Sequence, residues 1–451
     1  MSGVVSVRAD GSISWRADTA VVLGPVPFEV NGVLLTVDGA FPDVVVDLAA
    51  PSSTALAATA QWFADPAVIS QLAAAADGDI VSTPVLAEAL SVAAGVRVVD
   101  AIHLGDLDEG VVLLDHAGGA LAAGDAESAT ELYALSSAVA ERLVEQFTLE
   151  SITGPRVERL AEIVAAAPPG SISDATRQRI NRDLSPLLSR HDAEWVQILG
   201  AEQGSNLFYN TIDSLHLGLA EVRLAFPVDL RVLPPRLLKF VGVEVPELQV
   251  ETIKPAVIEV AADIRDDANT DSVETLSVFA VAAEASTGDL LAYAPTTVVD
   301  GRIVAELDVG DAPIDSLRCS LVGSGTNLET LRLDPVGAAL TRIDRYCRYA
   351  WTQRRVAGAL QANTGISSRD VFLTETQERA DAAHREARDA AESAVALTRQ
   401  LVRRSRGSAN ANDLAAYLDA LVRFADTTGA PPVIVGPFAP TLAELVLAGD
   451  T

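Results

Sequence analysis

The stretch IEVAADI, residues 258–264, alternates apolar side chains with polar or small ones, and IVAELDV, residues 303–309, repeats the pattern. A period of two places every second side chain on one face of a β-strand. Two turn signals, Thr287-Gly288-Asp289 and Asp300-Gly301, flank the strand-like segments in this part of the chain. Short strands at regular spacing with such turns are typical of an antiparallel β-sandwich. The sequence therefore predicts a sandwich domain over residues 227–334.

Residues 1–120 predict a mixed α/β domain. Asp10-Gly11 and Asn31-Gly32 each separate two short apolar stretches, and these dipeptides tolerate the positive φ angles of tight hairpin turns. Pro66 stands where a proline opens the first turn of a helix. Two valine-rich runs, at residues 96–99 and 111–114, predict further short strands.

Two other segments have the period of helices. The first is a helical region over residues 121–226, in which Ala126–Phe147 has apolar residues three and four apart and Asp125 as a candidate cap. The second is a helical hairpin or bundle with a tail over residues 335–451. The fold class expected for the whole chain is thus multidomain α+β.

The long helix expected over residues 369–404 carries a heptad-like seam. Spacings of three and four residues alternate along the seam, which consists of Ala380, Ala383, Ala387, Ala390, Ala394, Leu397 and Leu401. Alanine buries little area, so the seam needs a partner helix along its length. A preceding antiparallel helix of the same chain is the first candidate, and a coiled coil with a second copy is the alternative.

The chain is strongly acidic, with 62 acidic and 33 basic residues and a net charge of −29. This charge argues against general affinity for nucleic acid or anionic membranes, because both repel a polyanion. The charge is uneven: residues 1–335 carry −30, residues 336–406 carry +5 and residues 407–451 carry −4. The segment 336–406 is therefore a basic island in an acidic protein.

Composition also predicts a cytoplasmic location. No apolar run approaches the roughly 18–20 residues that a membrane span needs, and the first residues lack the pattern of a secretory signal. Cys319 and Cys347 are the two cysteines, and we expect both to be reduced. Arginine supplies 31 of the 33 basic residues, a bias associated with bacteria of high GC content.

One cluster of residues has the chemistry of a metal site. Imidazoles and carboxylates both bind divalent metals, and the candidate ligands here are His103, Asp106, Asp108 and His116. Their spacing matches no familiar metal motif, and the alternative is a solvated acidic loop between two short strands. If the cluster holds a metal, the implied activity is metal-dependent hydrolysis.

Sequence patterns of nucleophilic or nucleotide-binding enzymes do not occur in the chain. The sequence therefore favours a non-enzymatic protein over an enzyme. No cofactor is expected beyond the divalent metal considered above. Five residues, three or four apart, fall on one face of a predicted helix: Asn206, Tyr209, Asn210, Asp213 and His216. Such a face is either active-site material or, as the simpler alternative, a solvent-facing stripe.

The basic island contains Arg342, Arg345, Tyr346 and Tyr349 on one helical face. Interleaved arginine and tyrosine are typical of protein-contact hot spots and of base-stacking surfaces. Because the rest of the chain is acidic, a protein partner is favoured over nucleic acid. The alternative is that these arginines pair with acidic groups of the same molecule.

These observations predict a non-catalytic protein-interaction component, a scaffold or adaptor, in a larger bacterial cytosolic assembly. It would bind a protein partner or associate with itself, without contact to a membrane. Two other functions stay open: a metal-dependent hydrolase centred on residues 103–116, and an acidic protein that mimics nucleic acid and sequesters a basic protein.

Overall fold

The computed structural model of the chain divides by internal contacts into two units. Unit 1 combines residues Met1–Gly200 with Cys347–Thr451, and unit 2 comprises Ala201–Tyr346. The finer boundaries predicted after residues 120, 226 and 334 stay a prediction. The structure describes residues 2–18, 24–105, 107–150, 152, 154–184, 224–228, 233–234, 237–240, 247–266, 268, 270–323, 326, 328, 331, 333, 335–364, 370–407, 411–430 and 438–449. The candidate polar face at Asn206–His216 lies outside them.

Unit 1 begins with an antiparallel sheet of six strands in the order β3-β4-β5-β2-β1-β6. Its strands are β1 Ser2–Val7, β2 Ile13–Ala17, β3 Val26–Val30, β4 Val33–Asp38, β5 Phe41–Ala50 and β6 Ile80–Ser82. The turn at Asn31-Gly32 has positive φ at both residues and joins β3 directly to β4, as predicted. At Asp10-Gly11 only Gly11 has positive φ, and Arg8 N donates to Ser12 O across a longer loop.

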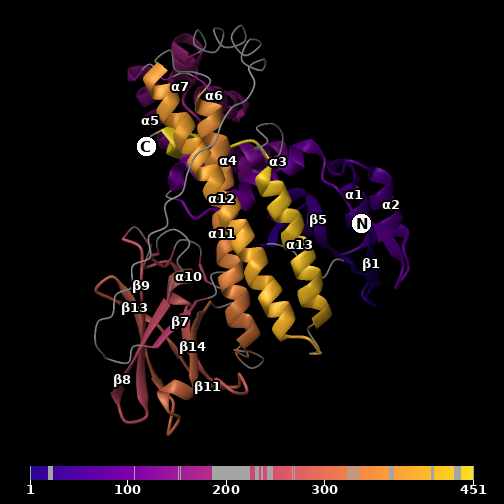
Figure 1. Cartoon of the computed structure of the whole chain (residues 1–451). Helices are drawn as coiled ribbons and strands as arrows, with labels where there is room; N and C mark the ends of the chain where they lie inside the picture. The colour runs from indigo at the N-terminus through magenta and orange to yellow at the C-terminus, as the bar shows by residue number, and fades with distance from the viewer. Residues whose placement is uncertain are drawn as a thin grey trace. The chain divides into compact units, whose positions relative to one another are not determined.

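Helices follow the sheet (Figure 1). They are α1 Ser53–Ala58, the 3-10 turn Ala60–Trp62, α2 Pro66–Ala74, α3 Glu88–Ile102, α4 Glu109–Ala122, α5 Ala126–Leu149, α6 Pro155–Ala166, α7 Asp174–Arg179 and the π-helical turn Ile180–Leu184. Pro66 opens α2 and Asp125 caps α5, both as predicted.

The two short strands predicted at residues 96–99 and 111–114 are wrong, because these runs lie inside α3 and α4. A short apolar run is compatible with a buried strand and equally with a buried helix. Burial on nearly all sides removes the polar face that would have revealed the helical period. The two helices approach closely: a Cβ on Gly119 of α4 would lie 3.3 Å from Ala93 Cα of α3.

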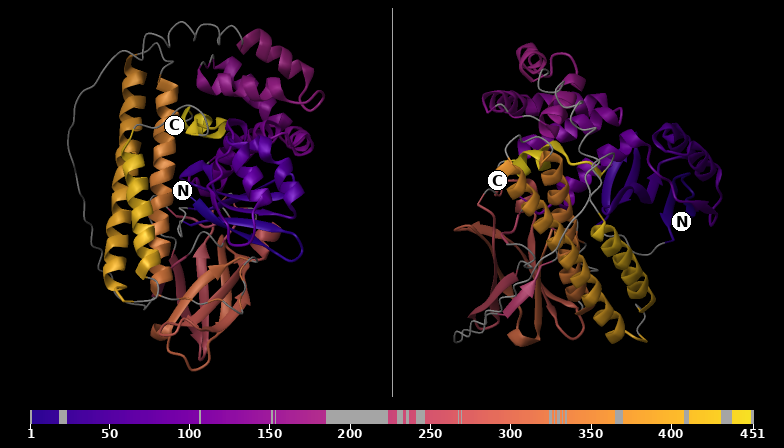
Figure 2. Two further views of the ribbon diagram at one scale, coloured as in Figure 1. Left: turned by 90° about the vertical axis from the view of Figure 1, so that its right-hand side faces the viewer. Right: turned by 45° about the horizontal axis from the view of Figure 1, so that its top comes forward.

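The C-terminal helices are α11 Pro335–Thr364, α12 Asp370–Arg404, α13 Ala411–Gly429 and α14 Leu442–Gly449. Helices α12 and α13 pack side by side in both views of Figure 2. The five alanines of the predicted seam are buried, and Ala380 shares a hydrophobic cluster with Leu360 of α11 and Leu445 of α14. The seam therefore packs within the chain, and the predicted hairpin or bundle is confirmed.

Unit 2 is a β-sandwich, as predicted. One sheet has the order β11-β10-β14 and the other β12-β13-β9-β8-β7. The strands are β7 Leu224–Pro227, β8 Glu247–Lys254, β9 Val257–Asp263, β10 Phe279–Glu284, β11 Leu290–Pro295, β12 Thr297–Val299, β13 Arg302–Asp308 and β14 Leu317–Val322, with α10 Val273–Leu276 and the 3-10 turn Ile314–Ser316. Both sheets contribute to one core.

Cys319 belongs to this core, and burial raises the pKa of its thiol to about 12. Cys319 and Cys347 are both buried, and neither forms a disulfide in the structure, which agrees with the expectation that both are reduced. Among the described residues, no helix is long and apolar enough to cross a membrane.

Candidate functional site

The short helix α14 begins with a capping box. Thr441 is its N-cap, and Glu444 stands three residues later. Thr441 N donates to Glu444 Oε2 at 2.9 Å, and Glu444 N donates to Thr441 Oγ1 at 3.3 Å. Each side chain thereby satisfies a backbone N–H that the first helical turn leaves unpaired. The carboxylate of Glu444 is buried in the process, with 2% of the residue exposed.

Arg355 of α11 compensates this buried charge. Its guanidinium binds Glu444 through two bonds, Nε to Oε1 at 2.8 Å and Nη2 to Oε2 at 2.6 Å. Nη1 and Nη2 also donate to the carbonyls of Phe438 and Ala439. Burial alone would raise the pKa of Glu444, but the charge and hydrogen bonds of Arg355, with His103 nearby, lower it below its ordinary value. The fork geometry of arginine suits such a two-bond contact.

Asp115 of α4 holds the same helix from another side. Its carboxylate accepts from Leu442 N at 3.0 Å and from Ala443 N at 2.8 Å. Burial raises the pKa of Asp115 to about 6, although these two hydrogen bonds oppose the increase. The positive end of the helix dipole offsets only part of the cost of burying this carboxylate. Asp115 therefore fastens the first turn of α14 to α4.

His103 completes the group, which we call the α14 anchor: His103, Asp115, Arg355, Thr441 and Glu444. Its Nδ1 accepts from Gly105 N at 2.9 Å, so a neutral ring carries its proton on Nε2. That nitrogen lies 3.8 Å from Glu444 Oε1. The anchor joins the end of α3, the middle of α4 and α11 to α14, and its charged groups are turned inward toward one another. This arrangement serves packing: it holds α14 in place.

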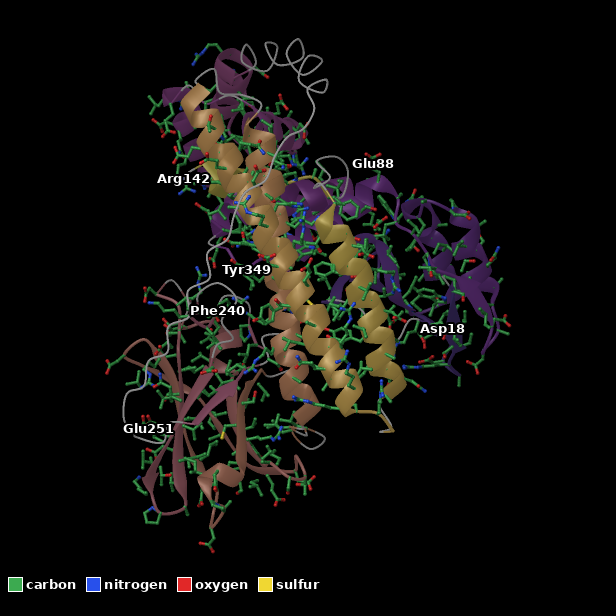
Figure 3. All side chains as sticks on the ribbon, in the orientation of Figure 1. Asp18, Glu88, Arg142, Phe240, Glu251 and Tyr349 are labelled. Carbon is green, nitrogen blue, oxygen red and sulfur yellow. The ribbon has the colours of Figure 1, made fainter. Side chains whose placement is uncertain are left out.

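The predicted metal cluster is divided among different partners. His116 Nε2 lies 3.3 Å from Asp100 Oδ2 of α3. Asp108 caps α4 by accepting from Gly110 N and Val111 N. Asp108 also pairs with Arg142 of α5, which Figure 3 labels.

His103 belongs to the α14 anchor, and Asp106 lies outside the described residues. Within the described part of the chain, no three His, Cys, Asp or Glu side chains are grouped to hold a metal ion. Because Asp106 is not among the described residues, a metal site formed by all four residues stays a prediction.

The predicted arginine and tyrosine face is divided as well. In unit 2, Arg345 is 1% exposed and its guanidinium carbon lies 4.2 Å from the ring centroid of Phe240, a cation–π contact. In unit 1, Tyr349 of α11 donates to Glu386 of α12 at 2.5 Å. Tyr346 is half-buried and Arg342 is exposed. Arg345 and Tyr349 thus each contact another residue of their own unit. The alternative, that the arginines pair with acidic groups of the same molecule, stays a prediction. Partner binding by the four residues together stays a prediction.

A different surface was missed by sequence reasoning. The segment LLAYAPTTVV, residues 290–299, has no charged residue and forms the consecutive edge strands β11 and β12. Four of its large apolar residues are exposed: Leu291, Tyr293, Val298 and Val299. Uncharged apolar edges pair readily with another strand. The region 227–334 contains 19 acidic and 8 basic residues, so a run of ten residues without any charge is unusual there. This run was the signal that sequence reasoning missed.

No protein-family model, curated protein or solved structure matches the chain. Its function is therefore inferred from its own residues. The α14 anchor is enclosed by the helices that it joins, whereas the edge of the sandwich at residues 290–299 faces solvent. Of these two features, the edge is the one a partner can reach.

The stability of unit 1 should depend on the ionisation of Asp115. Its pKa is about 6 in the folded protein, against an ordinary value of 3.8, so the folded state binds more protons between about pH 4 and 6. The contribution of Asp115 to stability is present below pH 4 and is lost as pH rises through 6. We expect Asp115→Asn to remove this loss. Its free energy of unfolding relative to wild type should rise by about 2 kcal/mol between pH 4 and 7.

Urea unfolding curves of both proteins across this pH range measure the difference. The matched control is Asp125→Asn, which also changes a helix-capping aspartate in unit 1 but at an exposed site. A pH-independent difference between Asp115→Asn and wild type would contradict the assignment.

Proposed function

We propose that the protein is a protein-interaction component, a scaffold or adaptor of a cytosolic assembly, and that it binds through the edge of its sandwich at residues 290–299. The observation that supports this proposal is the uncharged, exposed apolar edge formed by β11 and β12. An edge strand can accept an extended segment of a partner as an additional strand. Backbone hydrogen bonds then supply affinity, and exposed side chains supply specificity.

The chemistry of the edge defines the partner. Tyr293 and Leu291 offer apolar contact area, and tyrosine is enriched among residues that dominate binding energy. Acidic side chains border the edge, with Asp289 at one end and Asp300 at the other, both exposed. Their charge favours a partner strand with basic flanks. Pro295 interrupts the edge, because a proline cannot donate a backbone hydrogen bond, so pairing is expected on either side of it and not across it.

Replacing Tyr293 by lysine should abolish association while leaving the fold intact. Loss of an aromatic anchor costs about 2 kcal/mol or more of binding energy, which is a roughly thirtyfold or greater increase in Kd. The measurement is sedimentation velocity of the purified protein for self-association, together with quantitative mass spectrometry of proteins retained from a native bacterial lysate. An unchanged melting temperature of Tyr293→Lys shows that the variant is folded, so that a loss of association reports on binding.

The control is Leu149→Lys, which puts the same charge on an exposed leucine of α5 in unit 1. We expect it to associate like wild type. Identical behaviour of wild type and Tyr293→Lys, or a wild type that neither self-associates nor retains any protein, would rule the proposal out.

A further inference from the structure

Helix α14 is held by polar groups of helices that precede it in the chain. Asp115 of α4 accepts from the amides of the first turn, and Arg355 of α11 forms two bonds with Glu444. Asn363, also of α11, donates from Nδ2 to the carbonyl of Leu445 at 3.1 Å. The start and the middle of α14 are therefore both fixed by hydrogen bonds to other helices.

The apolar side of α14 packs against the same part of unit 1. Leu445 and Ala448 share a hydrophobic cluster with Leu360 of α11 and Ala380 of α12, and contacts with α4 and α6 enclose the helix further. Five apolar residues of α14 are 8% exposed or less: Leu442, Ala443, Leu445, Val446 and Ala448. The surface that receives the helix, which we call the α14 groove, includes Asp115, Arg355, Leu360, Asn363 and Ala380.

The polar part of the α14 groove determines which helix fits it. A buried ion pair adds little net stability, but a buried charge without its partner is costly. A segment without a glutamate three residues after its N-cap leaves Arg355 in that condition. Asp115 requires in addition the unpaired amides that the first turn of a helix offers. The groove is therefore selective for a helix that begins with a capping box and continues with apolar residues, as α14 does.

A second copy of the chain carries that helix. Residues 430–441 connect α13 to α14, and a stretch of this length spans at most about 40 Å. The groups of the α14 groove precede α13 in the chain, so α14 of another copy finds the same contacts there. Exchange of an identical element is a low-cost route to a dimer. A tethered segment typically has an effective concentration on the order of millimolar, so exchange is expected where copies are held close together.

We propose that the α14 groove accepts α14 of a second copy, so that two copies of the chain associate by reciprocal exchange of this helix. Each copy then contributes Thr441 and Glu444 to the anchor of the other. This inference concerns unit 1 and does not rest on the sandwich edge. Tyr293→Lys, placed in both copies, should leave the exchange unchanged.

Two full-length variants with complementary defects test the exchange. Arg355→Met damages the groove and keeps α14 intact, whereas Glu444→Gln damages α14 and keeps the groove intact. In each variant alone, one buried charge lacks its partner. In a mixed dimer, Glu444 of the first variant meets Arg355 of the second, and the two substituted side chains meet each other without a charge.

We expect the two variants to form a heterodimer at least about a hundredfold more tightly than either associates with itself, because exchange relieves two defects that each cost roughly 30-fold or more in affinity. The measurement is native mass spectrometry with one variant labelled with ¹⁵N, which separates the heterodimer from both homodimers. The control mixture is Arg399→Met with Glu392→Gln, both at exposed positions of α12. It should contain no more dimer than wild type.

A synthetic peptide of residues 438–449 provides a second measurement, which does not require Arg355→Met to fold. It should bind the Glu444→Gln protein at least about tenfold more tightly than the same peptide with Glu444→Gln does, as measured by fluorescence anisotropy. Equal binding of the two peptides, or none, would overturn the proposal, because the groove would then not recognise α14 of another molecule. A mixture of folded variants that contains no heterodimer would overturn it as well.

Discussion

Arg355→Met should lower the free energy of unfolding of unit 1 by about 3–5 kcal/mol, which is the usual cost of removing one partner from a buried ion pair. The substitution leaves the Glu444 carboxylate buried without its counter-charge and removes the donors to the carbonyls of Phe438 and Ala439. Folded domains are stable by only about 5–15 kcal/mol. The loss is therefore a large share of the total.

The measurement is urea unfolding followed by circular dichroism, together with hydrogen exchange of the α14 amides. Glu444→Gln in the Arg355→Met background should recover part of the loss, because it removes the stranded charge. The control Arg399→Met changes an exposed arginine and should shift stability by less than about 0.5 kcal/mol. Equal stability of Arg355→Met and this control would show that the ion pair does not anchor α14.

Arg345→Glu should destabilise unit 2 by about 3 kcal/mol or more, because it places an unpaired negative charge at a buried site. The wild-type guanidinium is 1% exposed and stacks on Phe240. Glutamate reverses the charge and is repelled by the negative face of the aromatic ring. Surface charge reversal, in contrast, changes stability little.

Arg342→Glu provides that contrast within one turn of the same helix, because Arg342 is exposed. Thermal unfolding of both variants by calorimetry, together with hydrogen exchange of the β8 to β14 amides, separates the two cases. A Tm shift of the same size in both would mean that Arg345 is not held at a buried site.

Much of the fold was predictable because its signals are local. Alternation at residues 258–264 and 303–309 marked β9 and β13, and Pro66 and Asp125 marked the starts of α2 and α5. The strands expected at 96–99 and 111–114 failed because both faces of α3 and α4 are largely buried. A helix without a polar face has no readable period.

The candidate sites were harder to predict because their partners are distant in sequence. Asp115 lies in the segment that suggested a metal, yet its partners Leu442 and Ala443 are 327 and 328 residues away. The Thr441–Glu444 capping box is a local pattern, but Arg355, which neutralises it, has no sequence signal connecting it to Glu444. Arg345 was placed on the correct helix. Its burial, however, depends on Phe240, more than one hundred residues earlier in the chain.

The division of unit 1 into two stretches of sequence has a consequence for how the protein is made. On the ribosome, β8 to β14 of the sandwich emerge together and can close their core before α12 to α14 exist. Asp115, buried in the finished protein, must wait for the amides of α14 to arrive 327 residues later. Closing so long a loop adds little to the equilibrium cost, which grows only with the logarithm of length, but contacts between distant residues slow folding. The chain order therefore allows a stage in which the sandwich is complete while Asp115 of α4 still lacks the amides of α14.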